Sequence, residues 1–291
     1  MRSNVRTVAG FLAIALMPFS AVQAKDADAL QLTYRYPDGG VAIYKNRGNV
    51  DLNMGVITAR LMTEYLSHEK KIDSTEELQG IEYTMTDLAE TVYVGGQLVP
   101  RDELSKLEGQ SVWFKLSPRG EVSGFEMGEM SDLTYAEEKV LKPVLASIRL
   151  NLPGQYPELP PGEIKVGDTW DSERTATTDD IEGVKGKTTT HATYKVKRKR
   201  HRKGHLCYEI EEVAATTTHA ILSFGQMTVL VSGKGSLKSK IEFDTESGLV
   251  LKYDQRGKMT VDTKPVGNQD VPPSRATMSI QSLRQLKEIE D

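Results

Sequence analysis

Apolar and polar side chains alternate with a period of two through most of this chain. Leu32, Tyr34 and Tyr36 are separated by polar residues, and the same alternation recurs in further stretches. Those stretches lie at 50–54, 81–85, 112–116, 194–196 and 206–210. Because successive side chains of a strand point to opposite faces, the alternation predicts antiparallel strands with one buried and one solvated face.

Turn signals rich in Gly, Pro, Asp and Ser separate these stretches. They occur at 37–40, 95–96, 117–120, 233–235 and 245–248. Three predicted strands, at 41–54, 205–222 and 248–262, approach or exceed ten residues, the upper end of usual strand length. Long strands with repeated glycines predict a strongly twisted and curved sheet.

Two segments carry helical signals. Residues 56–70 fit a helical stripe and a strand face equally well, and we favour a strand because the neighbouring segments are strands and no N-cap precedes it. Residues 134–149 begin with a capping box, Thr134 and Glu137, and predict the main helix, which Pro143 should kink. The Pro-rich connector 152–162 that follows would let this helix lift as a cover.

The connector divides the chain into two halves of similar design, at about 30–150 and 163–290. Each half reads as a β-meander, so we interpret the chain as a diverged internal duplication. The fold class that follows is mainly β: a curved antiparallel sheet, or unclosed half-barrel, built from two meander halves with one main covering helix. Residues 25–291 are expected to form a single β-rich domain.

Two short motifs carry a resemblance to a known family. Val-Gly-Asp-Thr-Trp at 166–170 follows the Pro-rich middle, and Asp-Thr-Glu-Ser-Gly-Leu at 244–249 forms a predicted hairpin. The chain, over roughly 30–290, resembles the periplasmic lipoprotein-carrier (LolA-type) superfamily, and more closely exported proteins with that fold. The resemblance implies an unclosed barrel with helices on its concave face and a hydrophobic cavity for acyl chains. It identifies no individual binding residue.

The first 24 residues have the pattern of a signal peptide. Arg2 and Arg6 precede a short apolar run at 8–19, and Val22 and Ala24 occupy the −3 and −1 positions of a cleavage site. The run is too short to span a bilayer, which needs about 20 apolar residues. We therefore expect export, with the periplasm as the address and secretion as the alternative.

Charge and cysteine content narrow the class of protein further. The formal net charge is −4, which gives no overall bias toward nucleic acid. Cys207 is the only cysteine, so the chain cannot form an intramolecular disulfide and is not a small disulfide scaffold.

A strongly basic stretch at 195–203 interrupts this acidic chain at a predicted hairpin tip. It predicts contact with an anionic membrane surface or an envelope protein, and the alternative is a solvated loop. The residues expected to make that contact are Arg198, Lys199, Arg200, Arg202 and Lys203.

Catalytic and metal-binding patterns are weak. His201, His205 and Cys207 have a spacing that could bind a soft metal, but the surrounding cations disfavour it, and inert packing of Cys207 is the expected alternative. The chain has no G-x-S-x-G elbow, and its adjacent acidic pairs, 179–180 and 211–212, would point to opposite faces of a strand. We therefore expect no enzyme activity, no catalytic residue, no metal and no cofactor.

The leading functional hypothesis is a non-enzymatic periplasmic binding or carrier protein for a lipid, an acyl chain or another hydrophobic ligand. The alternative is an adaptor or structural subunit of a cell-envelope complex. Apolar side chains of one predicted strand and of the helix would line the ligand cavity, although the pattern also fits a filled core. These residues are Val112, Phe114, Leu116, Leu141, Leu145 and Ile148.

Overall fold

The structure is a computed structural model. It describes residues 29–290 except 56, 76, 101, 128–133, 135–140, 142–143, 145, 179–183, 203, 225–226 and 267–272. The predicted signal peptide and Leu145 therefore lie outside the described residues.

The described residues are mainly β-strand, with two short 3-10 helices and a few helical residues. The strands are β1 (Leu30–Gln31), β2 (Val41–Asn53), β3 (Thr58–Ser74), β4 (Gln79–Val94), β5 (Gln97–Val99), β6 (Ser111–Leu116), β7 (Val122–Met127), β8 (Glu163–Ile164), β9 (Thr169–Thr177), β10 (Val184–Arg202), β11 (His205–Phe224), β12 (Met227–Asp244), β13 (Val250–Val266) and β14 (Ser274–Glu290). The 3-10 helices are η1 (Asp102–Leu107) and η2 (Leu152–Gln155).

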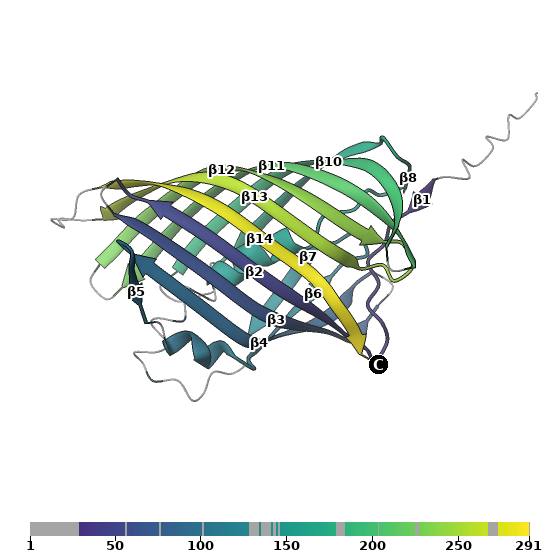
Figure 1. The fold of residues 1–291 in the computed structure, drawn as a ribbon, viewed down its shortest axis with the longest axis horizontal. Helices are drawn as coiled ribbons and strands as arrows, with labels where there is room; N and C mark the ends of the chain where they lie inside the picture. The colour runs from purple at the N-terminus through teal and green to yellow at the C-terminus, as the bar shows by residue number, and fades with distance from the viewer. Residues whose placement is uncertain are drawn as a thin grey trace, which may run out of the picture.

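Nearly all strands join one antiparallel sheet in the order β7-β6-β4-β3-β2-β14-β13-β12-β11-β10-β9, with β5 paired to β4. The last strand, β14, pairs with β2 and joins the two predicted halves. The edges β7 and β9 do not pair with each other, so the sheet is a half-barrel that is not closed. Figure 1 shows the long strands bent in the same sense around one interior. The predicted fold class is confirmed; the internal duplication stays a prediction.

The ambiguous segment 56–70 is strand, because it forms most of β3 and pairs with both β2 and β4. The three long strands predicted at 41–54, 205–222 and 248–262 are β2, β11 and β13. In the predicted helix, the described residues 141, 144 and 146–151 are helical, so the helix continues two residues beyond its predicted end.

The predicted strand at 32–36 is wrong, although its alternation does mark burial. Leu32, Tyr34 and Tyr36 are at most 4% exposed, yet β1 ends at Gln31. The backbone of this segment makes its hydrogen bonds with a loop and a side chain and not with a neighbouring strand. Tyr34 N–H donates to Pro118 O at 2.8 Å, and Tyr36 N–H donates to Gln79 Oε1 at 2.9 Å. The segment lies against loops at one end of the sheet.

One face of the sheet, the inner face, carries the core. Directly opposed residues of antiparallel strands share a face, and the buried Tyr44, Tyr83, Tyr194 and Tyr253 all belong to this one. The core is concentrated toward one end of the strands, where tyrosines contribute much of its volume.

Inward-facing glycines let the sheet curve without crowding its concave side. A Cβ on Gly235 would lie 2.2 Å from Met259 Cγ, and a Cβ on Gly257 would lie 2.3 Å from Leu237 Cδ2. Each glycine therefore leaves room for a large side chain of the neighbouring strand to lie across it.

Candidate functional site

A buried carboxylate, Glu69 on β3, organises the first part of the inner face. It is 0% exposed and accepts hydrogen bonds from four side chains. Arg284 Nη2 donates to its two oxygens at 2.8 and 2.6 Å, Tyr156 OH donates at 3.0 Å and Ser67 Oγ at 3.2 Å. Tyr36 OH is the fourth donor. The charge is therefore paired and its lone pairs are used, as burial of an ion requires.

A second buried carboxylate, Glu212 on β11, is held by a different set of side chains of the same types. Arg174 Nη2 donates to it at 2.8 Å and Tyr194 OH at 3.1 Å. Ser239 Oγ donates at 2.6 Å and Tyr253 OH at 2.8 Å. Both glutamates lie on the inner face of the sheet. Each of them binds one arginine, two tyrosines and one serine.

The two arginines hold the same short segment, η2. Arg174 Nη1 donates to Pro153 O at 3.3 Å, and Arg284 Nη1 donates to Gln155 O at 3.0 Å. Both carbonyls belong to η2, which directly follows the helix. Two buried ion pairs therefore fix the point at which the chain leaves the helix and crosses the interior.

The residues that follow η2 are fixed just as firmly. Tyr34 OH donates to Pro157 O at 3.0 Å, and Trp170 Nε1 donates to Glu158 O at 2.8 Å. Leu159 is fully buried. The expectation that the connector 152–162 acts as a loose hinge is therefore wrong over 152–159, because its carbonyl groups are held by side chains of the sheet and of the segment 32–36.

Burial keeps the tyrosines of these clusters protonated. It is the main cause that raises the pKa of Tyr36 and Tyr156 well above the ordinary value, and the negative charge of Glu69 raises both pKa values further. Burial is the largest single influence on Arg284 and disfavours its charged form, but Glu69 and the surrounding tyrosines together outweigh it, so the pKa of Arg284 lies well above its ordinary value. Tyr36 and Tyr156 therefore remain hydrogen-bond donors, and Arg284 remains charged, across the ordinary pH range.

Farther along the strands, the inner face is only half buried and carries many aliphatic side chains beside a few threonines such as Thr188 and Thr218. Apolar side chains from seven strands contribute to it, and register places all of them on the face of the core tyrosines. They are Val50, Leu52, Leu61, Val92, Leu222, Val229, Val231, Leu237, Met259, Val261, Met278 and Ile280. We call this set the apolar inner face.

The side chains predicted to line a cavity lie in the packed core instead of this half-buried region. Val112, Phe114, Leu116 and Leu141 are at most 4% exposed and belong to one buried cluster, against which Ile148 packs. The Phe114 ring centroid is 5.4 Å from that of Tyr156. These side chains contact protein on all sides, so the apolar inner face offers more accessible surface.

The basic hairpin is largely neutralised by neighbouring glutamates. Arg198 Nη2 lies 2.9 Å from Glu209 Oε2, and Arg200 and Arg202 both pair with Glu242. Lys199 Nζ lies 5.3 Å from the ring centroid of Tyr208. Lys203 is outside the described residues. Four of the five predicted contact residues are thus engaged within the protein.

Cys207 and the neighbouring histidines are not brought together as one group. His205 Nδ1 lies 3.0 Å from Asp244 Oδ2, and Cys207 is fully buried. Burial, followed by Asp244 and Glu242, raises the pKa of the Cys207 thiol to about 11. His201 is exposed. Among the described residues, no three His, Cys, Asp or Glu side chains are grouped so as to hold a metal ion.

Sequence reasoning did not identify the two buried ion pairs, although a signal was present. Glu69 has the parity of the inward-facing Tyr65, and Glu212 lies between the inward-facing Ile210 and Ala214. A charged residue at an apolar position of an alternating strand predicts a buried partner of opposite charge. The partner itself is not evident from the pattern, because Arg284 is 215 residues from Glu69.

The comparisons with known proteins find a likeness in fold. No protein family matches the chain, and no curated protein sequence matches it. A solved structure of lipovitellin, whose description concerns lipid–protein interactions, aligns with 88% of this chain and 26% of its own, at 14% identity and a TM-score of 0.50. This chain thus spans about a quarter of that protein's length, and the likeness shows the fold alone.

A second solved structure is of a Bacteroides fragilis protein described as exported and as having a YmcC-like fold. It aligns with 90% of this chain and all of its own, at 9% identity and a TM-score of 0.24, so we draw no argument from it. Membership of the LolA-type superfamily stays a prediction. No described helix is long and apolar enough to cross a membrane.

Proposed function

We propose that this protein binds a lipid, an acyl chain or another hydrophobic ligand on the apolar inner face of its half-barrel. The proposal includes that it acts without catalysis and outside the cytoplasm, in the periplasm, to which residues 1–24 would direct it. The observation that carries the proposal is the apolar inner face itself, a half-buried aliphatic surface contributed by seven strands. Burying such a surface against a ligand gains roughly 25 cal/mol per Å².

The composition of that face suits ligands of varied shape. Met259 and Met278 lie directly opposite each other on β13 and β14, and Ile280 is two residues farther along. Unbranched methionine side chains adapt to irregular partners. The likeness in fold to lipovitellin, a protein described by its lipid interactions, supports the same proposal.

The buried ion pairs give this face a rigid end. They attach the segment after the helix to the sheet through Arg174 and Arg284. Any movement that admits a ligand would therefore take place toward the opposite end of the strands, where the apolar inner face lies.

Titration with a dansyl-labelled fatty acid tests the proposal. Wild-type protein should bind the probe saturably, and the inner-face variant Met259→Gln/Ile280→Gln should weaken binding at least about tenfold, which corresponds to about 1.4 kcal/mol. The matched control is Leu66→Gln/Leu283→Gln, which removes two aliphatic side chains from the outer face and should bind as wild type does. Absence of saturable binding, or equal binding by both variants, would favour an envelope adaptor.

A further inference from the structure

The outer face of the sheet is strongly basic over β12 and β13, although the protein as a whole carries a net charge of −4. Residues of one parity on each strand point away from the core, and five of them are exposed cations. They are Lys234, Lys238, Lys240, Arg256 and Lys258, and we call them the basic face. Successive side chains on one face of a strand are about 7 Å apart, so these charges form a continuous patch.

The charges of the basic face are only partly balanced by the protein: Arg256 Nε lies 3.8 Å from Asp254 Oδ1, and Lys240 lies opposite Glu211 and Asp254 in the register. Among the described residues, Lys234, Lys238, Lys240 and Lys258 have no ion-pair partner. Lys238 lies directly opposite Arg256 in the register of β12 and β13. Like charges at directly opposed positions disfavour the sheet, so an external anion would relieve a repulsion already present in the fold.

The corresponding surface of β2 and β3 provides a contrast. There Lys45 and Arg47 both pair with Glu64, and Arg60 Nε lies 2.6 Å from Asp51 Oδ1. On that surface these three cations are held by two carboxylates, so most of their charge is compensated. The excess positive charge is therefore a local property of one side of the half-barrel.

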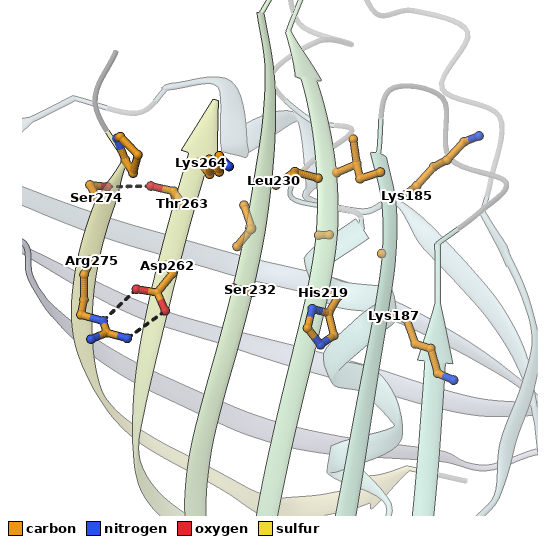
Figure 2. A pocket seen from close by; sticks show the side chains of 15 residues that line it. Lys185, Lys187, His219, Leu230, Ser232, Asp262, Thr263, Lys264, Ser274 and Arg275 are labelled. Atoms are coloured by element: carbon orange, nitrogen blue, oxygen red, sulfur yellow. Dashed lines mark hydrogen bonds and ion pairs between the residues drawn. The ribbon is translucent and has the colours of Figure 1, made fainter. Parts of the chain in front are cut away.

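Exposed aliphatic side chains accompany the cations. Val213 is 54% exposed and lies opposite Lys238 in the register of β11 and β12. A groove of about 970 Å³ crosses β10–β14 toward their far ends (Figure 2). Its lining includes Ile221 and Leu230, which are 40% and 41% exposed, together with Lys185.

We infer that the outer face of β10–β13 is a docking surface for a membrane that contains anionic phospholipid. Cations attract the headgroups, and exposed aliphatic side chains can enter the interfacial layer; together they distinguish a lipid surface from a purely acidic partner. The basic face takes this role in place of the hairpin at 195–203, whose arginines are already paired. The inference does not depend on ligand binding by the inner face.

Cosedimentation with vesicles tests the inference. We compare vesicles of phosphatidylcholine with and without phosphatidylglycerol, using the variant Lys234→Ser/Lys238→Ser/Lys240→Ser/Lys258→Ser. Each cation near an anionic surface contributes about fivefold in affinity, so this variant should lose at least about fiftyfold at low salt. Wild type should bind only the anionic vesicles, and added salt should weaken that binding.

Two matched control variants each remove four positive charges from another part of the surface. Lys45→Ser/Arg47→Ser/Arg60→Ser/Lys70→Ser changes the outer face of β2 and β3, and Arg198→Ser/Lys199→Ser/Arg200→Ser/Arg202→Ser changes the hairpin. Both should retain most of the binding. Equal loss in all three variants, loss confined to the hairpin variant, or wild-type binding to polyglutamate but not to vesicles would overturn the inference.

Discussion

At the scale of single residues, the inner face depends on how two buried charges are compensated. Glu69 and Glu212 are each held by an arginine, two tyrosines and a serine. A buried ion pair adds little net stability over a well-packed apolar pair, but removing one partner leaves an uncompensated charge. The consequence is an asymmetry between single and double substitutions that can be measured.

Arg284→Met should destabilise the protein by about 3–5 kcal/mol, because Glu69 is then buried without its cation. The double variant Glu69→Gln/Arg284→Met should recover a substantial part of that loss. Urea denaturation followed by circular dichroism measures both. A double variant no more stable than the single one would show that the charge of Glu69 is not the main cost.

The buried thiol of Cys207 should make the stability of the protein depend on pH. Its thiol pKa is raised to about 11 in the folded protein, whereas an unfolded cysteine titrates near about 8.5. Between these values the unfolded state loses its proton first, so the contribution of Cys207 to stability should decline as pH rises through that window.

The decline should appear as a difference in urea midpoint between wild type and Cys207→Ala that shrinks from pH 8 to pH 10.5, and alkylation of the native thiol at pH 8 should be much slower than alkylation of the unfolded chain. A difference that is constant with pH, together with rapid alkylation of the native protein, would contradict the raised pKa.

At the scale of elements, alternation predicted most long strands because a sheet with one buried face imposes a period of two on its sequence. It failed at 32–36, where Tyr34 and Tyr36 are buried in the same alternation without a strand partner. The sequence pattern indicates which side chains are buried. It does not indicate whether the backbone forms hydrogen bonds with a neighbouring strand or with a loop.

The candidate site was less predictable than the strands. The face of Phe114 was expected to be apolar, and it is, but the sequence pattern does not distinguish a filled core from an accessible surface. That distinction depends on what covers the face. Here Tyr156, which follows η2, packs against Phe114, and it reaches that position through contacts with residues far away in the chain.

The segment after the helix can be tested through Tyr156. Its hydroxyl donates one hydrogen bond to Glu69, and its ring packs against Phe114 and Tyr34. Tyr156→Phe should cost about 0.5–1.5 kcal/mol, and Tyr156→Ala about 3–5 kcal/mol. Limited proteolysis within 152–159 should increase only in the alanine variant. If both variants are as stable and as resistant as wild type, the segment is not held as the structure indicates.

At the scale of the whole molecule, the chain's first and last long strands lie side by side. β14 pairs with β2 over most of its length, and the Arg284–Glu69 ion pair crosses the same junction. The two predicted halves therefore share hydrogen bonds and a buried charge pair. Neither half contains both members of that pair, so the structure favours unfolding of the two halves as one unit.

The two tryptophans of the chain test this coupling, since Trp113 lies on β6 in the first half and Trp170 on β9 in the second. Each of the variants Trp113→Phe and Trp170→Phe leaves one fluorescent probe. Within each variant, the urea transition seen by fluorescence should coincide with that seen by circular dichroism, because loss of one half breaks the β2–β14 ladder and leaves Glu69 or Arg284 unpaired. Trp170→Phe also removes the hydrogen bond to Glu158 O, so the two variants are expected to differ in midpoint from each other. A fluorescence transition separated from the circular dichroism transition within one variant would mean that the halves unfold independently, and that the junction at β14 contributes little to the stability of the half-barrel.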